Sequence, residues 1–215
     1  MSSSSPTRVA FQGEPGAFSE DAALKLLGAE IQLVPRRTFE TLFTSFEEGL
    51  AEFVLVPVEN SLIGSIHSAV DLLNKTSFGI VGEVTIPIRH FLIGCPGAVF
   101  ENIVAVESHP AALAQCSRFF AAHPHLERVE TDDTAGSVAR IVQCGDPTRA
   151  AIAGRRAADV YGGSILKENL EDSPENHTRF LLLSGQDQPT RRFEKFKFET
   201  NQVKDQKAKD KNHDR

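Results

Sequence analysis

The feature that most constrains the fold of this chain is the alternation of short apolar segments with amphipathic helical segments. The segment at residues 38–50 repeats apolar side chains at helical spacing, among them Phe39, Leu42 and Phe46, and an apolar run at 52–58 follows it. The same order recurs further along, where "NIVAVESHP" precedes "AALAQCSRFFAAH". Strands that alternate with helices in this way are typical of an α/β fold with mostly parallel sheets.

The charge and the apolar content of the chain argue against two classes of partner. A net charge of −6 provides no broad basic surface for nucleic acid. No apolar run approaches the roughly 20 residues that cross a bilayer, and the opening "MSSSSPTR" lacks the apolar middle of a secretory signal. We therefore expect a protein that binds neither nucleic acid nor a membrane.

The sequence also lacks the usual motifs of metal, nucleotide and serine-hydrolase sites. Its three cysteines, Cys95, Cys116 and Cys144, are scattered and form no CxxC, which is typical of reduced thiols in a reducing compartment. The "HPH" at residues 123–125 has no further ligand at chelating spacing. "QGEPGAF" lacks the GxGxxG spacing, and no GxSxG motif occurs. We expect no metal and no cofactor.

Polar clusters with a hydroxyl side chain adjoin four of the predicted strands. In open α/β sheets, ligands bind beyond the carboxyl ends of strands, where the following helices begin. A serine or threonine at a helix start is also a common cap, so one such position carries little information. Together the four clusters predict a cleft for a small, oxygen-rich anion. Their hydroxyl residues are Ser61, Ser108, Thr134 and Thr178.

Blocks spread along the sequence resemble, in order and spacing, the catalytic domain of prephenate dehydratase and of its relative arogenate dehydratase. The blocks are "AFQGEPGAFSEDAA", "PVENSLIGSIHSAVDLL", "ESHPAALAQC", "DDTAGS" and "NHTRFLLL", and they extend from about Val9 to Leu183. The resemblance implies two α/β lobes around a central cleft, similar to type II periplasmic binding proteins.

The resemblance implies removal of the ring hydroxyl and ring carboxylate of prephenate, which gives phenylpyruvate, water and carbon dioxide in phenylalanine biosynthesis. Aromatisation drives this reaction, so the resemblance implies a small dicarboxylate partner and no cofactor. Two alternatives stay open. An arogenate dehydratase would make phenylalanine directly, and an acidic group in the cleft would favour it. A catalytically silent ligand-binding homologue belongs to another class.

The resemblance also assigns roles to single residues. Thr178 is the expected catalytic residue, which places a hydrogen bond or a proton near the leaving hydroxyl. Arg179 would clamp a carboxylate or orient a structural acid, Phe180 would pack its strand or touch the substrate, and His109 would face the site or cap its helix. The expected substrate-binding residues are Asn60, Ser61, Ser108, His109, Thr134, Ala135, Asn176, Arg179 and Phe180, with Glu59 and Gln115 behind them.

We expect two lobes built from an interrupted stretch of chain. Lobe 1 of the dehydratase domain would cover residues 7–87 plus 165–186, and lobe 2 would cover residues 88–164. The chain would cross between them near residues 85–90 and 160–168.

The segment that follows the lobes has a different character. Residues 187–215 are charged, with little apolar periodicity, and we predict a disordered tail there. This segment is too short for the regulatory ACT domain that family members usually carry, so we expect none. The resemblance implies a homodimer, which is the usual oligomeric state in this family. We expect it in the cytoplasm, or in the plastid stroma if a transit segment has been removed.

Overall fold

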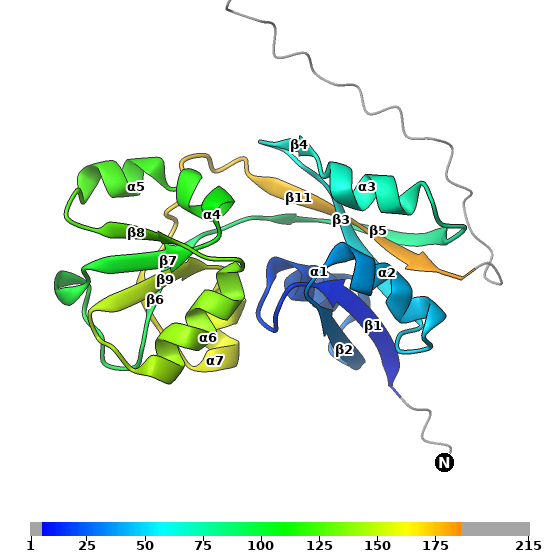
Figure 1. The fold of residues 1–215 in the computed structure, drawn as a ribbon, viewed down its shortest axis with the longest axis horizontal. Coiled ribbons are helices and arrows are strands. Elements are labelled where there is room, and N and C mark those ends of the chain that lie inside the picture. Colours follow the sequence, from blue (N-terminus) through cyan, green and yellow to red (C-terminus); the bar gives the residue numbers. More distant parts are fainter. Residues whose placement is uncertain (1–5, 186–215) are drawn as a thin grey trace, which may run out of the picture.

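The computed structural model describes residues 6–185, which form two β-sheets with helices packed against them (Figure 1). The predicted tail at 187–215 lies outside the described residues. In chain order the elements are β1 (Thr7–Gln12), α1 (Phe18–Leu27), β2 (Ile31–Arg36), α2 (Phe39–Glu47), β3 (Phe53–Asn60), β4 (Gly64–Ser65), α3 (His67–Leu73), β5 (Gly79–Pro87), β6 (Phe91–Gly94), a short 3-10 helix η1 (Phe100–Asn102), β7 (Ala105–Ser108), α4 (Pro110–Ala114), α5 (Ser117–Ala122), β8 (Glu127–Glu130), α6 (Thr134–Cys144), β9 (Arg149–Ala153), α7 (Arg155–Tyr161), β10 (Ser164–Lys167) and β11 (His177–Ser184).

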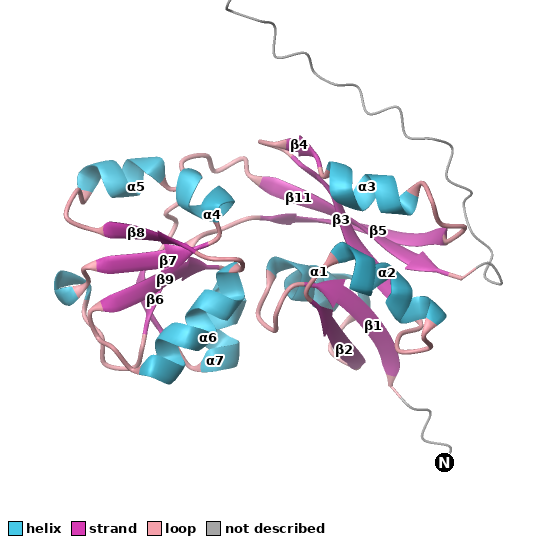
Figure 2. Ribbon diagram, in the orientation of Figure 1, coloured by secondary structure: helices cyan, strands magenta, loops and turns pink. Residues whose placement is uncertain are grey.

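The first sheet has the strand order β2-β1-β3-β11-β5, with β4 paired to β3, and the second has the order β10-β6-β9-β7-β8. Both sheets are mixed rather than mostly parallel. β1 runs parallel to β2 and β3, and β7 runs parallel to β8 and β9. β11 and β6 run antiparallel to their neighbours because each follows a segment that crosses from the other sheet. In Figure 2 the strands of the second sheet lie between α4 and α5 on one side and α6 and α7 on the other.

The first sheet is covered on both faces, which explains the uninterrupted apolar run of β3. Successive side chains of a strand point to opposite faces, and the two apolar clusters follow this rule. Leu55 belongs to the cluster that continues into the second sheet, whereas Val54 and Val56 belong to the cluster under α2 and α3. A strand buried on both faces needs apolar residues at every position, and the alternating apolar and polar pattern of a half-exposed strand is lost.

Local sequence signals mark the start of α2 and both ends of α6. Thr38 caps α2 by accepting a hydrogen bond from the backbone N–H of Thr41, and the Thr41 side chain accepts one from Thr38 in return. Asp133 caps α6, and Gly145, at φ 69°, ends it in the left-handed conformation that glycine adopts without strain.

Two short segments carry the chain between the sheets. The first comprises residues 88–90, within the range expected from the sequence. The second was expected near residues 160–168, but β10 pairs with β6 in the second sheet, and the chain returns over residues 168–176. The two segments lie against each other, since the Ile88 N–H donates to the Asn176 carbonyl over 2.8 Å and the Leu170 N–H donates to the His90 carbonyl over 3.0 Å.

We propose that each sheet, together with the helices packed on it, forms one lobe of the domain. The strands of lobe 1 then come from residues 7–87 and 177–184, and those of lobe 2 come from residues 91–167. Among the strands, this differs from the expected boundary in residues 165–167, and residues 168–176, which were expected in lobe 1, form the second crossing. The strand of residues 165–167, β10, extends the edge of the second sheet and has no partner in the first.

Candidate active site

A cavity of about 210 Å³ opens between the two sheets. Its walls come from the loop between β1 and α1, from β3 and β11 in the first sheet, and from the starts of α4 and α6 in the second. Among the described residues that line it there is no lysine or arginine, so a bound anion would depend on hydrogen-bond donors and backbone dipoles. The apolar part of the lining includes Phe18, Pro57, Ile63, Ile66, Ile88 and Phe180.

A row of hydrogen-bonded side chains begins at Thr178 in the wall of this cavity. Asn60, the last residue of β3, donates from Nδ2 to Thr178 Oγ1 over 2.9 Å and to Asn176 Oδ1 over 2.8 Å. The register between β3 and β11 sets Thr178 directly opposite Asn60. All three side chains are buried, where a satisfied polar network is rigid and an unsatisfied one is costly.

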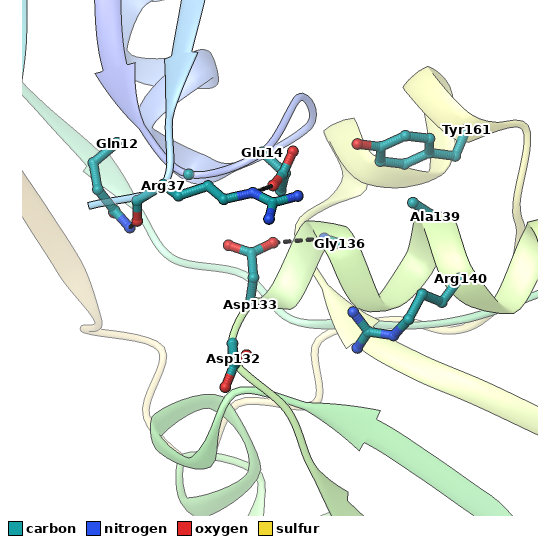
Figure 3. Close-up of a pocket in the computed structure, with 10 residues that line it drawn as sticks. Gln12, Glu14, Arg37, Asp132, Asp133, Gly136, Ala139, Arg140 and Tyr161 are labelled. Atoms are coloured by element: carbon teal, nitrogen blue, oxygen red, sulfur yellow. Dashed lines mark hydrogen bonds and ion pairs between the residues drawn. The ribbon is translucent and has the colours of Figure 1, made fainter. Parts of the chain in front are cut away.

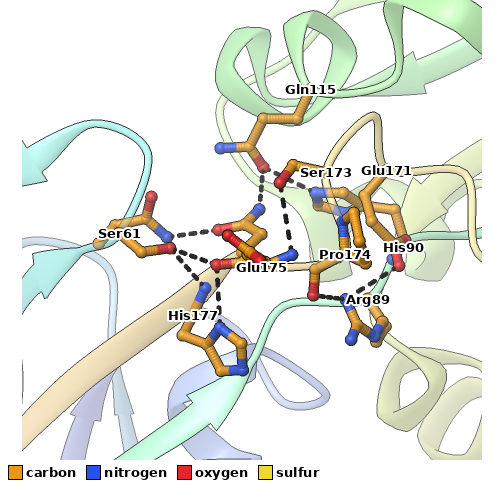
Figure 4. A network of polar contacts seen from close by, with 11 residues as sticks. Ser61, Arg89, His90, Gln115, Glu171, Ser173, Pro174, Glu175 and His177 are labelled. Atoms are coloured by element: carbon orange, nitrogen blue, oxygen red, sulfur yellow. Dashed lines mark hydrogen bonds and ion pairs between the residues drawn. The ribbon is translucent and has the colours of Figure 1, made fainter.

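The row continues into the second sheet and ends at the first crossing segment. Asn176 Nδ2 donates to Gln115 Oε1 over 2.9 Å, and the same oxygen lies 2.9 Å from His90 Nε2. Gln115 is the C-cap of α4, and His90 directly precedes β6 (Figure 4). We refer to His90, Gln115, Asn176, Asn60 and Thr178 as the polar row.

Backbone groups fix the direction of every hydrogen bond in the polar row. The N–H groups of Leu62 and Ile63 donate to Asn60 Oδ1 over 3.0 and 3.3 Å, so Asn60 Nδ2 is the donor toward Thr178 and Asn176. Thr178 Oγ1 is therefore an acceptor in its bond with Asn60. Its own proton has no acceptor among the described residues and is available to a ligand in the cavity.

A second cavity, of about 430 Å³, adjoins the first and shares Asp133 with it (Figure 3). Its lining is charged. Arg37 donates to Glu14 over 2.9 Å, and one carboxylate oxygen of Asp133 accepts from the backbone N–H of Gly136. Burial raises the pKa of Asp133, and the nearby charge of Glu14 raises it further. An acidic side chain thus stands where the two cavities meet.

The structure brings together part of the residue set expected from the sequence. Thr134 reaches the cavity at the start of α6, and Phe180 reaches it from β11, two residues beyond Thr178 on the same face of the strand. His109 also caps α4, because its Nδ1 accepts from the Ala111 N–H over 3.2 Å. The expected residues that line the cavity are Asn60, His109, Gln115, Thr134, Thr178 and Phe180. Asn176 lies just behind them in the polar row.

Several other expected residues are engaged away from the lining. The Ser61 hydroxyl donates to the Glu175 carbonyl over 2.7 Å and accepts from the His177 N–H over 2.9 Å (Figure 4). The Ser108 hydroxyl is fully buried and donates to the Ile152 carbonyl over 2.6 Å, which holds β7 against β9.

Two charged residues and one alanine of the expected set also lie outside the cavity wall. The Arg179 guanidinium donates to Glu83 over 2.9 and 3.2 Å and lies 3.6 Å from Glu59, so it orients neighbouring acids. Arg179 alternates with Thr178 and Phe180 along β11, which turns it to the other face of the sheet. Ala135 is fully buried beside Thr134 in the first turn of α6.

Some residues that the sequence did not single out also line the cavity. Gln12, the last residue of β1, and Phe18, the first residue of α1, flank the glycine-containing turn, for which room beside a substrate was the expected use. His90 enters from the crossing segment and is only 1% exposed. A lone histidine directly before the buried run "FLIG" was the available signal for a buried polar role.

Within residues 6–185, no three histidine, cysteine, aspartate or glutamate side chains gather in an arrangement that would hold a metal ion. No helix among these residues has the length and apolar character that crossing a membrane requires.

Comparisons with known proteins agree with this fold. A family model described as prephenate dehydratase matches residues 9–188. An Arabidopsis thaliana protein described as arogenate dehydratase/prephenate dehydratase 1, chloroplastic, is 42% identical over 180 residues, which make up 84% of this chain and 45% of that protein. The structure of prephenate dehydratase from Arthrobacter aurescens in complex with L-Phe has a TM-score of 0.78 at 28% identity, over 87% of this chain and 63% of that one.

A further solved structure with this fold has a different description. The protein described as GqqA, a novel type of quorum quenching acylase, has a TM-score of 0.74 at 32% identity, over 84% of this chain and 65% of that one. This chain spans about half the length of the curated relatives it matches. The expected α/β architecture with two sheets is confirmed. The family model covers most of the sequence, from the first strand to just beyond the last, and the chain therefore belongs to the prephenate dehydratase family.

Proposed function

We propose that this chain converts prephenate to phenylpyruvate by decarboxylating dehydration. The observation that carries the proposal is the Thr178 hydroxyl, which accepts a hydrogen bond from Asn60 and keeps its own proton free at the wall of a cavity. That arrangement presents a donor to a leaving hydroxyl group, and the reaction requires such a donor.

The proposed reaction consumes a proton and involves no external oxidant or reductant. The bond between ring carbon C1 and its carboxylate breaks, carbon dioxide leaves, and the electron pair enters the ring. The C4–oxygen bond breaks at the same time or later, and the departing hydroxide takes up the proton and leaves as water. Thr178 would donate a hydrogen bond to that oxygen as its negative charge develops.

Two features of the surroundings support this role for Thr178. A threonine hydroxyl is a weak acid, and the hydrogen bond from Asn60 to its oxygen polarises the O–H group toward the cavity. The apolar lining solvates a carboxylate poorly, which favours decarboxylation because charge is more dispersed in the transition state. At the start of α6 the Gly136 N–H already donates to Asp133, so the Thr134 hydroxyl at the cavity wall is the donor proposed for the second carboxylate.

A second candidate function is arogenate dehydration, in which the product is phenylalanine. Arogenate carries an ammonium group where prephenate carries a keto oxygen, and Asp133 at the cavity wall is an acidic partner for an ammonium group. The matched Arabidopsis thaliana relative is described with both activities. The fold itself does not decide the reaction, because it also occurs in a structure described as an acylase. A silent ligand-binding homologue would bind a dicarboxylate without turnover.

We further propose that the protein acts as a homodimer in a reducing compartment. Support for the compartment comes from the cysteines, which are all free thiols. The choice between cytoplasm and plastid stroma follows the relatives, of which the Arabidopsis thaliana protein is described as chloroplastic.

The paired-substrate assay tests the proposal. Purified protein is supplied with prephenate or with arogenate, and kcat/KM for phenylpyruvate or phenylalanine formation is compared. In Thr178→Ala we expect a loss of kcat of about 100-fold or more, as for removal of a hydrogen-bond donor to a developing negative charge. Thr178→Ser keeps the hydroxyl and should retain much more of the activity. Thr44→Ala, on the exposed side of α2, is the matched control and should leave kcat unchanged.

The outcomes separate the hypotheses. Turnover of prephenate with the higher kcat/KM supports the main proposal, and a higher value for arogenate supports the second candidate. Binding of either compound without product would identify the silent homologue. Full activity in a folded Thr178→Ala variant would remove Thr178 from the mechanism.

A further inference from the structure

His90 closes the polar row at the end opposite to Thr178, in a position that ties the two crossing segments together. Its backbone N–H donates to Glu171 Oε2 over 2.9 Å, and its carbonyl accepts from the Leu170 N–H over 3.0 Å. The neighbouring Arg89 donates to the Pro174 carbonyl over 2.7 Å and lies 3.2 Å from Glu171 (Figure 4). Contacts with the second crossing segment therefore fix the His90 backbone, and with it the position from which the imidazole extends.

The hydrogen-bond directions in the polar row determine the tautomer of His90. Asn60 donates to Asn176 Oδ1, so Asn176 donates from Nδ2 to Gln115 Oε1. The Gln115 atom that faces His90 is therefore the carbonyl oxygen, and His90 Nε2 must carry a proton to approach it at 2.9 Å. This sequence of donors starts at two backbone N–H groups, which cannot be reversed.

The surroundings of the His90 imidazole favour its neutral form. Burial lowers the pKa of His90, and the hydrogen bond to Gln115 and the charge of Glu171 offset this only in part. With the proton on Nε2, Nδ1 carries a lone pair, and this buried atom has no hydrogen-bond partner among the described residues. The ring also packs edge-on against Phe18, with centroids 5.7 Å apart. A buried nitrogen without a partner has a free-energy cost, so the unpaired Nδ1 lowers the stability of the folded state.

We propose that His90 is a positioning residue that orients the Thr178 hydroxyl through Gln115, Asn176 and Asn60. Gln115 Oε1 accepts from both His90 and Asn176, so loss of the His90 donor frees the Gln115 amide to rotate. Asn176 then loses the fixed acceptor for its Nδ2 group, and its Oδ1 no longer holds Asn60 Nδ2 from that side, while Leu62 and Ile63 still hold Asn60 Oδ1. Because Gln115 is the C-cap of α4, which packs on the second sheet, and Thr178 lies in the first sheet, the row is complete only when the two lobes are in contact.

The test compares two replacements of His90 with a control histidine elsewhere. His90→Leu fills a similar volume without a donor, and His90→Gln places an amide N–H at about the reach of Nε2. His123 is a partly buried histidine bonded to the Phe119 carbonyl at the far end of the second lobe, outside the cavity lining, and His123→Leu controls for loss of a histidine. The full chain is assayed with prephenate and arogenate, and the folded fraction of each variant is measured by urea denaturation.

We expect His90→Leu to lose about 3- to 10-fold in kcat, the effect of one hydrogen bond, with KM nearly unchanged. His90→Gln should recover most of that loss, and His123→Leu should match the wild type. Imidazole nitrogen NMR of the unmodified protein at neutral pH should show His90 protonated on Nε2 alone. A protonated Nδ1, or equal losses in His90→Leu and His90→Gln, would overturn the proposal.

This role rests on the proposed function, and the activity of the wild-type protein distinguishes failure of the proposed function from failure of the role of His90. Wild-type protein that turns over neither substrate refutes the proposed function and this role with it. An active wild type beside an equally active and folded His90→Leu variant overturns the role of His90 alone.

Discussion

The turn after β1 meets α7 closely at Gly16, at the junction of the two lobes. A Cβ atom added at Gly16 would lie 2.7 Å from the Cα atom of Ala157, which is backbone and cannot move aside by a rotamer change. Gly16 also has φ +86°, and its N–H donates to Glu20 over 2.8 Å. Glu20 in turn accepts from Arg156 of α7 over 2.8 Å. Gly16→Ala therefore perturbs the junction of the lobes directly.

Gly28 provides the matched control for this substitution. It has φ +80°, nearly the same as Gly16, but no atom lies within 4 Å of an added Cβ. Gly28→Ala should cost about 1–3 kcal/mol for the backbone conformation alone, because φ +80° with ψ −174° is a region almost restricted to glycine. Gly16→Ala bears that cost and the overpacking against α7, about 1–3 kcal/mol more. The lower entropy of the unfolded chain affects both variants alike and cancels in the difference.

Urea denaturation of both variants, with turnover of the better substrate, measures these effects. We expect Gly16→Ala to lose more free energy of unfolding than Gly28→Ala and also to lose activity, because relief of the clash separates Gln115 from Asn176. Gly28→Ala should keep its activity. If Gly16→Ala proves as stable and as active as Gly28→Ala, the lobes do not meet at this glycine as described.

Two further predictions concern titratable groups. Burial, with the charges of Glu20 and Asp159 and against the attraction of Arg156, raises the pKa of Asp21 to about 6. The native state then binds the proton more tightly than the unfolded chain does, so the stability contributed by Asp21 falls as pH rises from about 4 to 6. Asp21→Asn should therefore raise the free energy of unfolding by about 1–2 kcal/mol at pH 7.5, a figure discounted for partial solvent screening, and by much less at pH 4.5. An equal effect at both pH values would contradict this. Burial raises the pKa of the Cys116 thiol, so a thiol reagent at pH 8 should label only the exposed Cys144 in the native protein, with Cys95 and Cys116 reacting after denaturation; rapid native labelling of all three thiols would contradict the described packing.

The sequence was sufficient to predict the fold class, because alternating strand and helix patterns depend on local periodicity. The buried run of β3 and the apolar stripe of α2 were both visible in this way. The sequence did not indicate the direction of β11, because that direction depends on which end of the first sheet the second crossing segment reaches. The second crossing was misplaced for a similar reason, since "SILK" forms an edge strand only through its partner β6.

At the candidate site, the structure brings together expected residues that are direct neighbours in the strand ladder. Asn60 and Thr178 are such a pair. The sequence did not reveal which face of a strand a side chain occupies, so Arg179 was grouped with Thr178 although alternation turns it toward Glu83. Nor could it show that the Ser108 hydroxyl is taken by the Ile152 carbonyl, since that contact joins strands more than forty residues apart in sequence.

The position of β11 has a consequence for how the protein is made. This strand lies between β3 and β5 in the interior of the first sheet, yet it is the last of the described elements to leave the ribosome. Until it arrives, β3 and β5 have no common partner and their facing edges stay open to other chains. All strands of the second sheet come from one uninterrupted stretch of the sequence, residues 91–167, so this sheet can form earlier during synthesis. A nascent chain that stalls before His177 would therefore expose two unpaired strand edges, those of β3 and β5, next to a second lobe that has already folded.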